Sequence, residues 1–214
     1  MKQKLVPFLS LAIVIASFIV AVIVYPNLPA KVPSHWNLAG EVDGYINQFW
    51  GAFLMPFISL GLYILFLIIP KIDPKRENIR KFIGEFNVFI FFILLFLAAI
   101  YAFSLLWSFG YHLNINRLMP ALFAMLMAYI AVLVERAEPN YTIGIRTPWT
   151  LSSAEVWAKT HKLGGKLFKA CAIIALVGII VPQYAFYLVI IPIIAISVWL
   201  FIYSYLIFEK EKWK

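Results

Sequence analysis

Residues 5–25 read LVPFLSLAIVIASFIVAVIVY and contain no charged side chain. A helix needs about 20 mostly apolar residues to cross a hydrocarbon core about 30 Å thick, so this run is long enough to span a bilayer. It is longer than the apolar region of a secretory signal peptide, which has about 7–15 residues, and no clear A-x-A cleavage site follows it. We therefore expect a retained first transmembrane helix.

Five further apolar runs follow the first one. They cover residues 50–70, 86–107, 118–134, 167–181 and 184–208. The chain of 214 residues is 64% hydrophobic and only 13% charged, whereas soluble domains are about half apolar and about a quarter charged. The sequence therefore predicts an all-α polytopic membrane protein with six transmembrane helices and no room for a second large soluble domain.

The basic residues predict the orientation of these spans. If the N-terminus lies inside, all of the 18 Lys and Arg residues except Lys31 and Arg117 fall in inner segments, as the positive-inside rule requires. Both termini are therefore expected in the cytoplasm. This bias accounts for the net charge of +8 without a nucleic-acid partner. The single cysteine, Cys171, lies in an apolar run, which indicates a buried thiol and excludes a disulfide within the chain.

Two polar segments divide the chain into two expected units. Residues 1–70 form an N-terminal two-helix unit, and residues 26–49 between its helices form an extracytoplasmic segment that we call the cap. Residues 71–214 form a four-helix unit with a cytoplasmic segment, residues 135–166, that we call the signature loop. Loops that are long for their context are often functional or locally folded.

The cap combines helix-breaking and turn-forming residues. Three prolines near its start exclude a regular helix, and Gly40 and the pair Asp43-Gly44 are turn signals. We expect one or two short strands and a tight turn. The candidate partner-binding residues of the cap are His35, Trp36, Asn37, Gly40, Asp43 and Gly44.

Three interpretations of the cap remain open from the sequence. A structural turn with a hydrogen-bonded histidine is the favoured one, and a recognition surface for an outside partner is compatible with it. A metal site made by His35, Glu41 and Asp43 is the third. One histidine with two carboxylates at this spacing matches no specific metal pattern, so we expect no metal.

The signature loop reads ERAEPNYTIGIRTPWTLSSAEVWAKTHKLGGK. Ser152 and Glu155 have the spacing of a capping box, which predicts that a helix begins there. Trp157 and His161 are four residues apart and share one face of that helix. We expect an amphipathic helix at the inner interface, followed by a bend at Gly164-Gly165 into a short fifth span.

The candidate binding residues of this loop would contact a partner or a lipid. They are Asn140, Gly144, Arg146, Pro148, Trp149, Trp157 and His161. The guanidinium of Arg146 has two main interpretations, a structural lock together with Asn140 and a contact to a partner or a lipid phosphate. The sequence shows no nucleophile–base pair, phosphate-binding glycine loop or metal-ligand cluster, so we expect neither an enzyme nor a cofactor.

Both segments also resemble a known family. The pattern N-x-x-x-G-I-R-T-P-W-T-L-S-S-x-x-x-W-x-x-x-H, from Asn140 to His161, resembles the signature of the SdpI family of membrane immunity proteins. The cap patterns P-x-H-W-N, from Pro33, and G-E-x-D-G-Y, from Gly40, resemble a small uncharacterised domain that usually precedes it. With the six spans, the resemblance covers nearly the whole chain.

The resemblance implies a multi-pass membrane protein of a prokaryote. Members with an assigned role protect the producing cell from its own secreted antimicrobial peptide, and they also signal by holding a transcriptional repressor at the membrane. A peptide toxin outside and a repressor inside are therefore the implied partners, in addition to membrane lipids. The alternative function is that of a transporter or lipid-handling protein, although no acid or base lies at a predicted span midplane.

Overall fold

The computed structural model describes the backbone of residues 2–212 and the side chains of residues 5–211. The orientation prediction also used Lys2, Lys4, Lys212 and Lys214, whose side chains lie outside that range. The main elements are α1 (Lys2–Val24), β1 (Lys31–Trp36), β2 (Val42–Asn47), α2 (Gln48–Ile72), α3 (Arg76–Lys81), α4 (Ile83–Ser108), α5 (Ile115–Arg136), α6 (Pro148–Ser152), α7 (Ala154–Ile180) and α8 (Ala185–Lys212). A short 3-10 turn, Tyr25–Asn27, follows α1, and another, Pro182–Tyr184, precedes α8.

Six helices among the described residues are long and apolar enough to cross a membrane, with mean hydropathies between 2.0 and 2.8. They are α1, α2, α4, α5, α7 and α8, and each contains most or all of one predicted span. Large apolar side chains face outward from them, such as Ile180 at 79% and Phe8 at 67% exposure. Such surfaces suit lipid rather than water. The prediction of an all-α polytopic membrane fold is confirmed.

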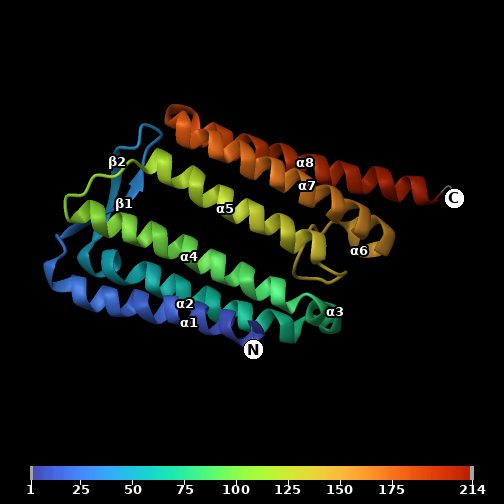
Figure 1. Ribbon diagram of the computed structural model, residues 1–214, viewed down its shortest axis with the longest axis horizontal. Helices are drawn as coiled ribbons and strands as arrows, with labels where there is room; N and C mark the ends of the chain where they lie inside the picture. The colour runs from blue at the N-terminus through green and yellow to red at the C-terminus, as the bar shows by residue number, and fades with distance from the viewer. Residues whose placement is uncertain (1, 213–214) are drawn as a thin grey trace.

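The helices form two groups that α4 joins (Figure 1). Helices α1, α2 and α4 pack together, while α5 packs most extensively against α7, which also contacts α8. The strands lie at one end of the bundle, and α3 and α6 lie at the other end, where α1 begins and α8 finishes (Figure 1). We refer to these as the cap end and the loop end. The cytoplasmic position of the loop end remains a prediction.

The fifth span differs from the prediction. Helix α7 runs without a break for 27 residues from Ala154, so the expected interfacial helix and the short span are one continuous element. Its first turns bury Trp157 and His161 against the bundle, and Lys159 lies on the exposed side, paired with Glu155. Ser153 caps the N-terminus of this helix, because its hydroxyl accepts a hydrogen bond from Val156 N–H at 3.2 Å. The predicted capping box from Ser152 is wrong.

The glycine pair in α7 is a packing contact instead of a bend. A Cβ on Gly164 would lie 2.4 Å from the Ile145 side chain, and one on Gly165 would lie 2.2 Å from Glu135 Cγ on α5. Small residues allow helix backbones to approach closely inside membranes. Gly164 and Gly165 therefore set the distance between α7 and its neighbours.

Candidate functional site

The cap folds as the predicted hairpin. Strands β1 and β2 are antiparallel, with Lys31 opposite Asn47 and His35 opposite Gly44. The turn spans residues 37–41 and includes Gly40 at a φ of 83°, a left-handed conformation that glycine adopts without strain. The sequence predicted a turn at Asp43-Gly44, and this prediction is wrong, because both residues belong to β2.

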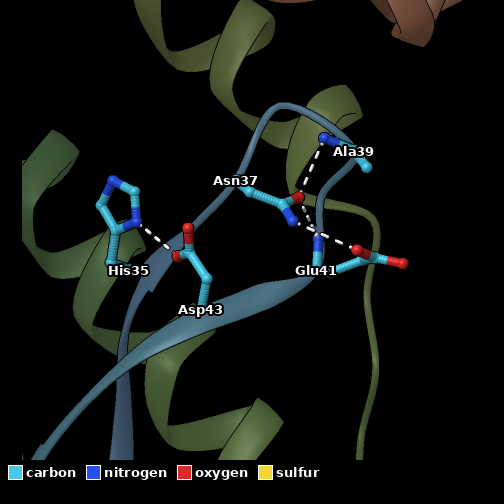
Figure 2. A network of polar contacts seen from close by, with 5 residues as sticks. All are labelled: His35, Asn37, Ala39, Glu41 and Asp43. Carbon is cyan, nitrogen blue, oxygen red and sulfur yellow. Dashed lines mark hydrogen bonds and ion pairs between the residues drawn. The ribbon is translucent and has the colours of Figure 1, made fainter.

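The side chain of Asn37 closes this turn (Figure 2). Its Oδ1 accepts hydrogen bonds from the N–H groups of Ala39 and Glu41 at 2.9 and 3.0 Å. Its Nδ2 donates to the Glu41 carboxylate at 3.1 Å. Asparagine favours turns because its side chain satisfies nearby backbone donors in this way. Asn37 is therefore part of the scaffold that presents the hairpin tip.

His35 and Asp43 form a pair across the hairpin (Figure 2). His35 Nδ1 lies 2.5 Å from Asp43 Oδ1, and the two side chains are 70% and 44% exposed. Glu41 does not join them, because its carboxylate turns toward Asn37. The part of the chain that the structure describes contains no group of three or more His, Cys, Asp or Glu residues arranged to hold a metal.

Polar contacts fix the cap onto three helices. Gln48 on α2 donates to the carbonyls of Tyr25 and Leu28, both at 2.9 Å. Ser104 on α4 donates to the Pro33 carbonyl at 2.6 Å. Asn116 on α5 donates to the Leu38 carbonyl at 3.0 Å. These bonds hold both the base and the tip of the hairpin against the bundle.

Trp36 adds an aromatic contact between the cap and α4. Its ring meets Phe103 edge-on at 5.1 Å and Trp107 at 6.0 Å between ring centres. Its indole Nε1 is buried, with no hydrogen-bond partner among the described residues. A buried donor without a partner is costly, so the Trp36 ring is held by its aromatic contacts and not by a hydrogen bond to another described residue.

A cavity of about 640 Å³ lies between the cap, α4, α5 and α8. Its polar wall includes His35, Trp36, Asn37 and Asp43 of the cap and Asn116 of α5. Its apolar wall is larger and includes Met119, Phe123, Phe186 and Ile190. This volume and this mixture of a mainly apolar lining with a few polar groups are typical of ligand sites. The cavity therefore brings four of the six predicted cap residues together, while Gly40 and Gly44 shape the hairpin.

The loop end holds a second group of predicted residues, which Asn140 organises. This side chain is 1% exposed. Its Oδ1 accepts from the N–H groups of Thr142 and Ile143 at 2.9 and 2.6 Å, and its Nδ2 donates to the carbonyls of Glu138 and Ile143, both at 2.8 Å. The Asn140 side chain therefore provides hydrogen-bond partners for the backbone N–H and C=O groups of this turn.

Asp73, which the sequence analysis missed, locks this turn to α2. It is 2% exposed. Its Oδ2 accepts from Tyr141 N–H at 3.0 Å and from the Thr142 hydroxyl at 2.7 Å, while its Oδ1 accepts from Lys75 N–H at 2.7 Å. The only sequence signal was an acidic residue directly after an apolar span and before Pro74.

Trp157 and His161 stack on each other beside Gly144. Their rings are 3.9 Å apart at an angle of 16°, and Trp157 Nε1 donates to the Ala137 carbonyl at 2.7 Å. His161 Nε2 accepts from Ile145 N–H at 3.0 Å, so its other ring nitrogen, 2.9 Å from the Trp157 carbonyl, carries the proton. Gly144 has a φ of 121°, and a Cβ there would lie 2.5 Å from His161 Nε2.

The remaining predicted residues of the signature loop lie nearer the surface. Arg146 is exposed and donates to the Tyr141 carbonyl at 2.6 Å. Pro148 is exposed at the start of α6, and Trp149 is half-buried against Phe201 and Tyr205 of α8. The structure thus separates three buried residues, Asn140, Trp157 and His161, and the half-buried Gly144 from the accessible Arg146 and Pro148.

Comparison with known families identifies two segments of the chain. Residues 136–204 match the model of the SdpI/YfhL protein family, and residues 12–60 match a domain of unknown function, DUF1648. These matches cover the signature loop and the cap, and they confirm the resemblance that the two sequence patterns carry.

Two proteins of Bacillus subtilis (strain 168) are similar to the chain. The protein named Immunity protein SdpI is 26% identical over 211 residues, which cover 98% of each chain. Uncharacterized membrane protein YbgB is 36% identical over 47 residues, or 22% of this chain and 52% of the other. No solved structure matches. The similarity and the six apolar helices indicate a multi-pass cell-membrane protein of bacteria.

Proposed function

We propose that this relative of the SdpI family of membrane immunity proteins protects a bacterial cell by binding a secreted antimicrobial peptide at its cap end. The observation that carries the proposal is the similarity to Immunity protein SdpI over 98% of both chains. The family matches include the cap and nearly all of the signature loop, so the similarity extends to both the cap end and the loop end.

The cavity under the cap supports this choice of site. Antimicrobial peptides are commonly amphipathic, with basic residues on one face and large apolar residues on the other. The apolar wall from Met119 to Ile190 suits the apolar face of such a peptide. The Asp43 carboxylate in the polar wall and the exposed Glu41 carboxylate at the hairpin turn, outside the cavity lining, suit a basic residue. A volume of about 640 Å³ accommodates several side chains, so we propose that one segment of the peptide enters.

The protein would act by binding rather than by catalysis. Capture of the peptide at the outer surface would keep it from the lipid that it disrupts. The cap is suited to capture because Gln48, Ser104 and Asn116 hold it in place before any ligand arrives. Such preorganisation lowers the entropic cost of binding.

A survival assay tests the proposal. The chain would be expressed in a toxin-sensitive host, and its amount in the membrane would be measured. Met119→Trp fills the cavity and should reduce survival toward that of cells without the protein. Met125→Trp, on the same helix but outside the cavity lining, should leave protection intact. Unchanged sensitivity of cells with normal amounts of the wild-type protein would contradict the immunity function.

The second part of the proposal is that the loop end contacts a transcriptional repressor. Its support is the accessible surface of the signature loop, where Tyr141 is 46% exposed and Arg146 and Pro148 are exposed. If this surface is the contact, Arg146→Ala should release a membrane-held regulator into the soluble fraction, whereas Lys166→Ala should not. Equal retention of the regulator by both variants would contradict a contact between Arg146 and the regulator.

A further inference from the structure

A second cavity, of about 510 Å³, lies at the loop end between α1, α3, α4 and α5. Figure 1 shows α3 beside the start of α4, at the end opposite the hairpin. Arg80 and Lys81 of α3 and Glu85 and Asn87 of α4 supply polar groups to its wall. Val6 and Val88 supply apolar ones. The cavity therefore combines both charges with an apolar surface near the predicted inner membrane boundary.

Two opposite charges in this wall are left without protein partners. Neither the Lys81 ammonium nor the Glu85 carboxylate makes a hydrogen bond or an ion pair within the described part of the chain. Arg80 is paired with Glu77 at 2.6 Å. Tyr129 donates to the backbone carbonyl of Glu85 at 3.1 Å, so the carboxylate itself stays free.

The position of Glu85 makes a missing partner significant. It lies half-buried in the first turn of a membrane-spanning helix, where an ionised group is costly unless it is paired or reaches water. The nearby half-buried Asn87 adds an amide oxygen that can accept a hydrogen bond. These acceptors suit a ligand ammonium that donates several hydrogen bonds.

The other half of the cavity suits a phosphate. Lys81 and Arg80 supply positive charge, and the first backbone N–H groups of α4 add the positive end of a 26-residue helix. The space beside this turn is open at Gly84, because a Cβ placed there would meet nothing within 4 Å. A ligand that joins a phosphate to a primary amine would satisfy both halves at once.

We propose that this cavity binds the phosphoethanolamine headgroup of a zwitterionic membrane phospholipid. The phosphate lies at Lys81 and the start of α4, the ammonium lies at Glu85 and Asn87, and an acyl chain follows the apolar wall at Val6 and Val88. A quaternary ammonium headgroup fits less well, because it has no N–H to donate to the carboxylate. A headgroup without an amine leaves Glu85 unpaired.

Native mass spectrometry of the purified full-length protein tests this assignment. The protein would be mixed with equal amounts of phosphatidylethanolamine, phosphatidylglycerol and phosphatidylcholine. The wild type should retain phosphatidylethanolamine at least several-fold more than the other two. Equal retention of all three lipids by the wild type would overturn the proposal, whatever the variants do.

Two variants separate the two halves of the site. Glu85→Gln should abolish the preference for phosphatidylethanolamine over phosphatidylglycerol, and Lys81→Gln should weaken the retention of both. Glu138→Gln and Lys166→Gln, which remove charges outside the cavity, serve as matched controls and should retain the wild-type preference. A Glu85→Gln variant with the wild-type preference would contradict the ammonium position.

Soluble phosphoethanolamine distinguishes a lipid from a free metabolite. This headgroup should displace the bound lipid only weakly, because it lacks the acyl chain that packs against the apolar wall. Binding of soluble phosphoethanolamine as tightly as the whole lipid would overturn the assignment to a membrane phospholipid.

Discussion

The side-chain amide of Asn116 donates a hydrogen bond to the carbonyl of Leu38 at 3.0 Å. The two residues are 78 positions apart in the chain, and the bond joins the tip of the hairpin to α5. Helix α5 belongs to the group with α7 and α8, whereas the base of the hairpin is held by α2 and α4. This bond therefore ties the two groups together at the rim of the 640 Å³ cavity.

Loss of this bond should loosen the hairpin tip. One hydrogen bond contributes about 0.5–1.5 kcal/mol, so Asn116→Ala should raise the equilibrium constant for local opening by about 2- to 10-fold. Hydrogen exchange of residues 31–47 in lipid nanodiscs measures this change. Gln183→Ala, which removes an exposed amide near the start of α8, should leave the exchange unchanged. Equal exchange in the Asn116→Ala variant and the wild type would show that the cap does not depend on this bond.

The orientation of the bundle is a separate prediction. In a Cys171→Ser background, a cysteine at Leu38, which is 56% exposed at the hairpin tip, should react with a membrane-impermeant maleimide added to intact cells. A cysteine at the exposed Glu138 should react only after the cells are opened. The reverse pattern would show that the cap end faces the cytoplasm and would contradict the outer binding site.

Asn140 should be the most sensitive polar residue of the signature loop. Asn140→Ala leaves the part-buried N–H group of Thr142 and the buried N–H group of Ile143 without acceptors, and an unsatisfied buried donor costs about 1–3 kcal/mol. A clear drop in the Tm of the purified protein is expected. Asn78→Ala removes one bond, to the Pro139 carbonyl, and should lower the Tm less. Equal losses would show that Asn140 does not organise the turn.

Gly144 should not tolerate a side chain. Alanine at a φ of 121° is strained, and its Cβ would lie 2.5 Å from His161 Nε2, so Gly144→Ala should cost at least about 2 kcal/mol. Gly61→Ala is the matched control, because a Cβ there meets nothing within 4 Å. Thermal unfolding in the same detergent compares the two. A Gly144→Ala variant as stable as wild type would contradict the packing around His161.

Hydropathy was sufficient to predict five of the six spans closely, because lipid selects for long apolar runs whatever packs beside them. It failed for α7, where Lys159, Lys162 and Lys166 break the apolar run. Those lysines lie on one side of the helix, where their side chains are partly or fully exposed. Residues of the opposite side, such as Val156 and Trp157, are buried. A hydropathy average over a window of sequence cannot separate the side of a helix that carries lysines from the side that is buried.

The sequence was sufficient to predict which residues belong to the candidate sites, but not how their side chains contact one another. Turn and glycine patterns located the cap and the signature loop, since local backbone chemistry determines them. Asp73 was missed because its partners Tyr141 and Thr142 lie 68 and 69 residues away in the chain. The cavity was missed for the same reason, because it exists only once the hairpin lies over α5 and α8.

Photo-cross-linking tests whether a secreted peptide is captured in the cavity under the cap. A benzophenone amino acid would replace Phe186, which lines the cavity and is 50% exposed, or Phe57, which lies on α2 outside the cavity lining and is 47% exposed. Cells making each variant would receive a labelled secreted peptide to which the wild-type protein gives resistance. We expect a cross-linked product from position 186 and little from position 57. Equal labelling at both positions, or none at 186 while that variant still protects the cell, would contradict capture of the peptide in the cavity under the cap.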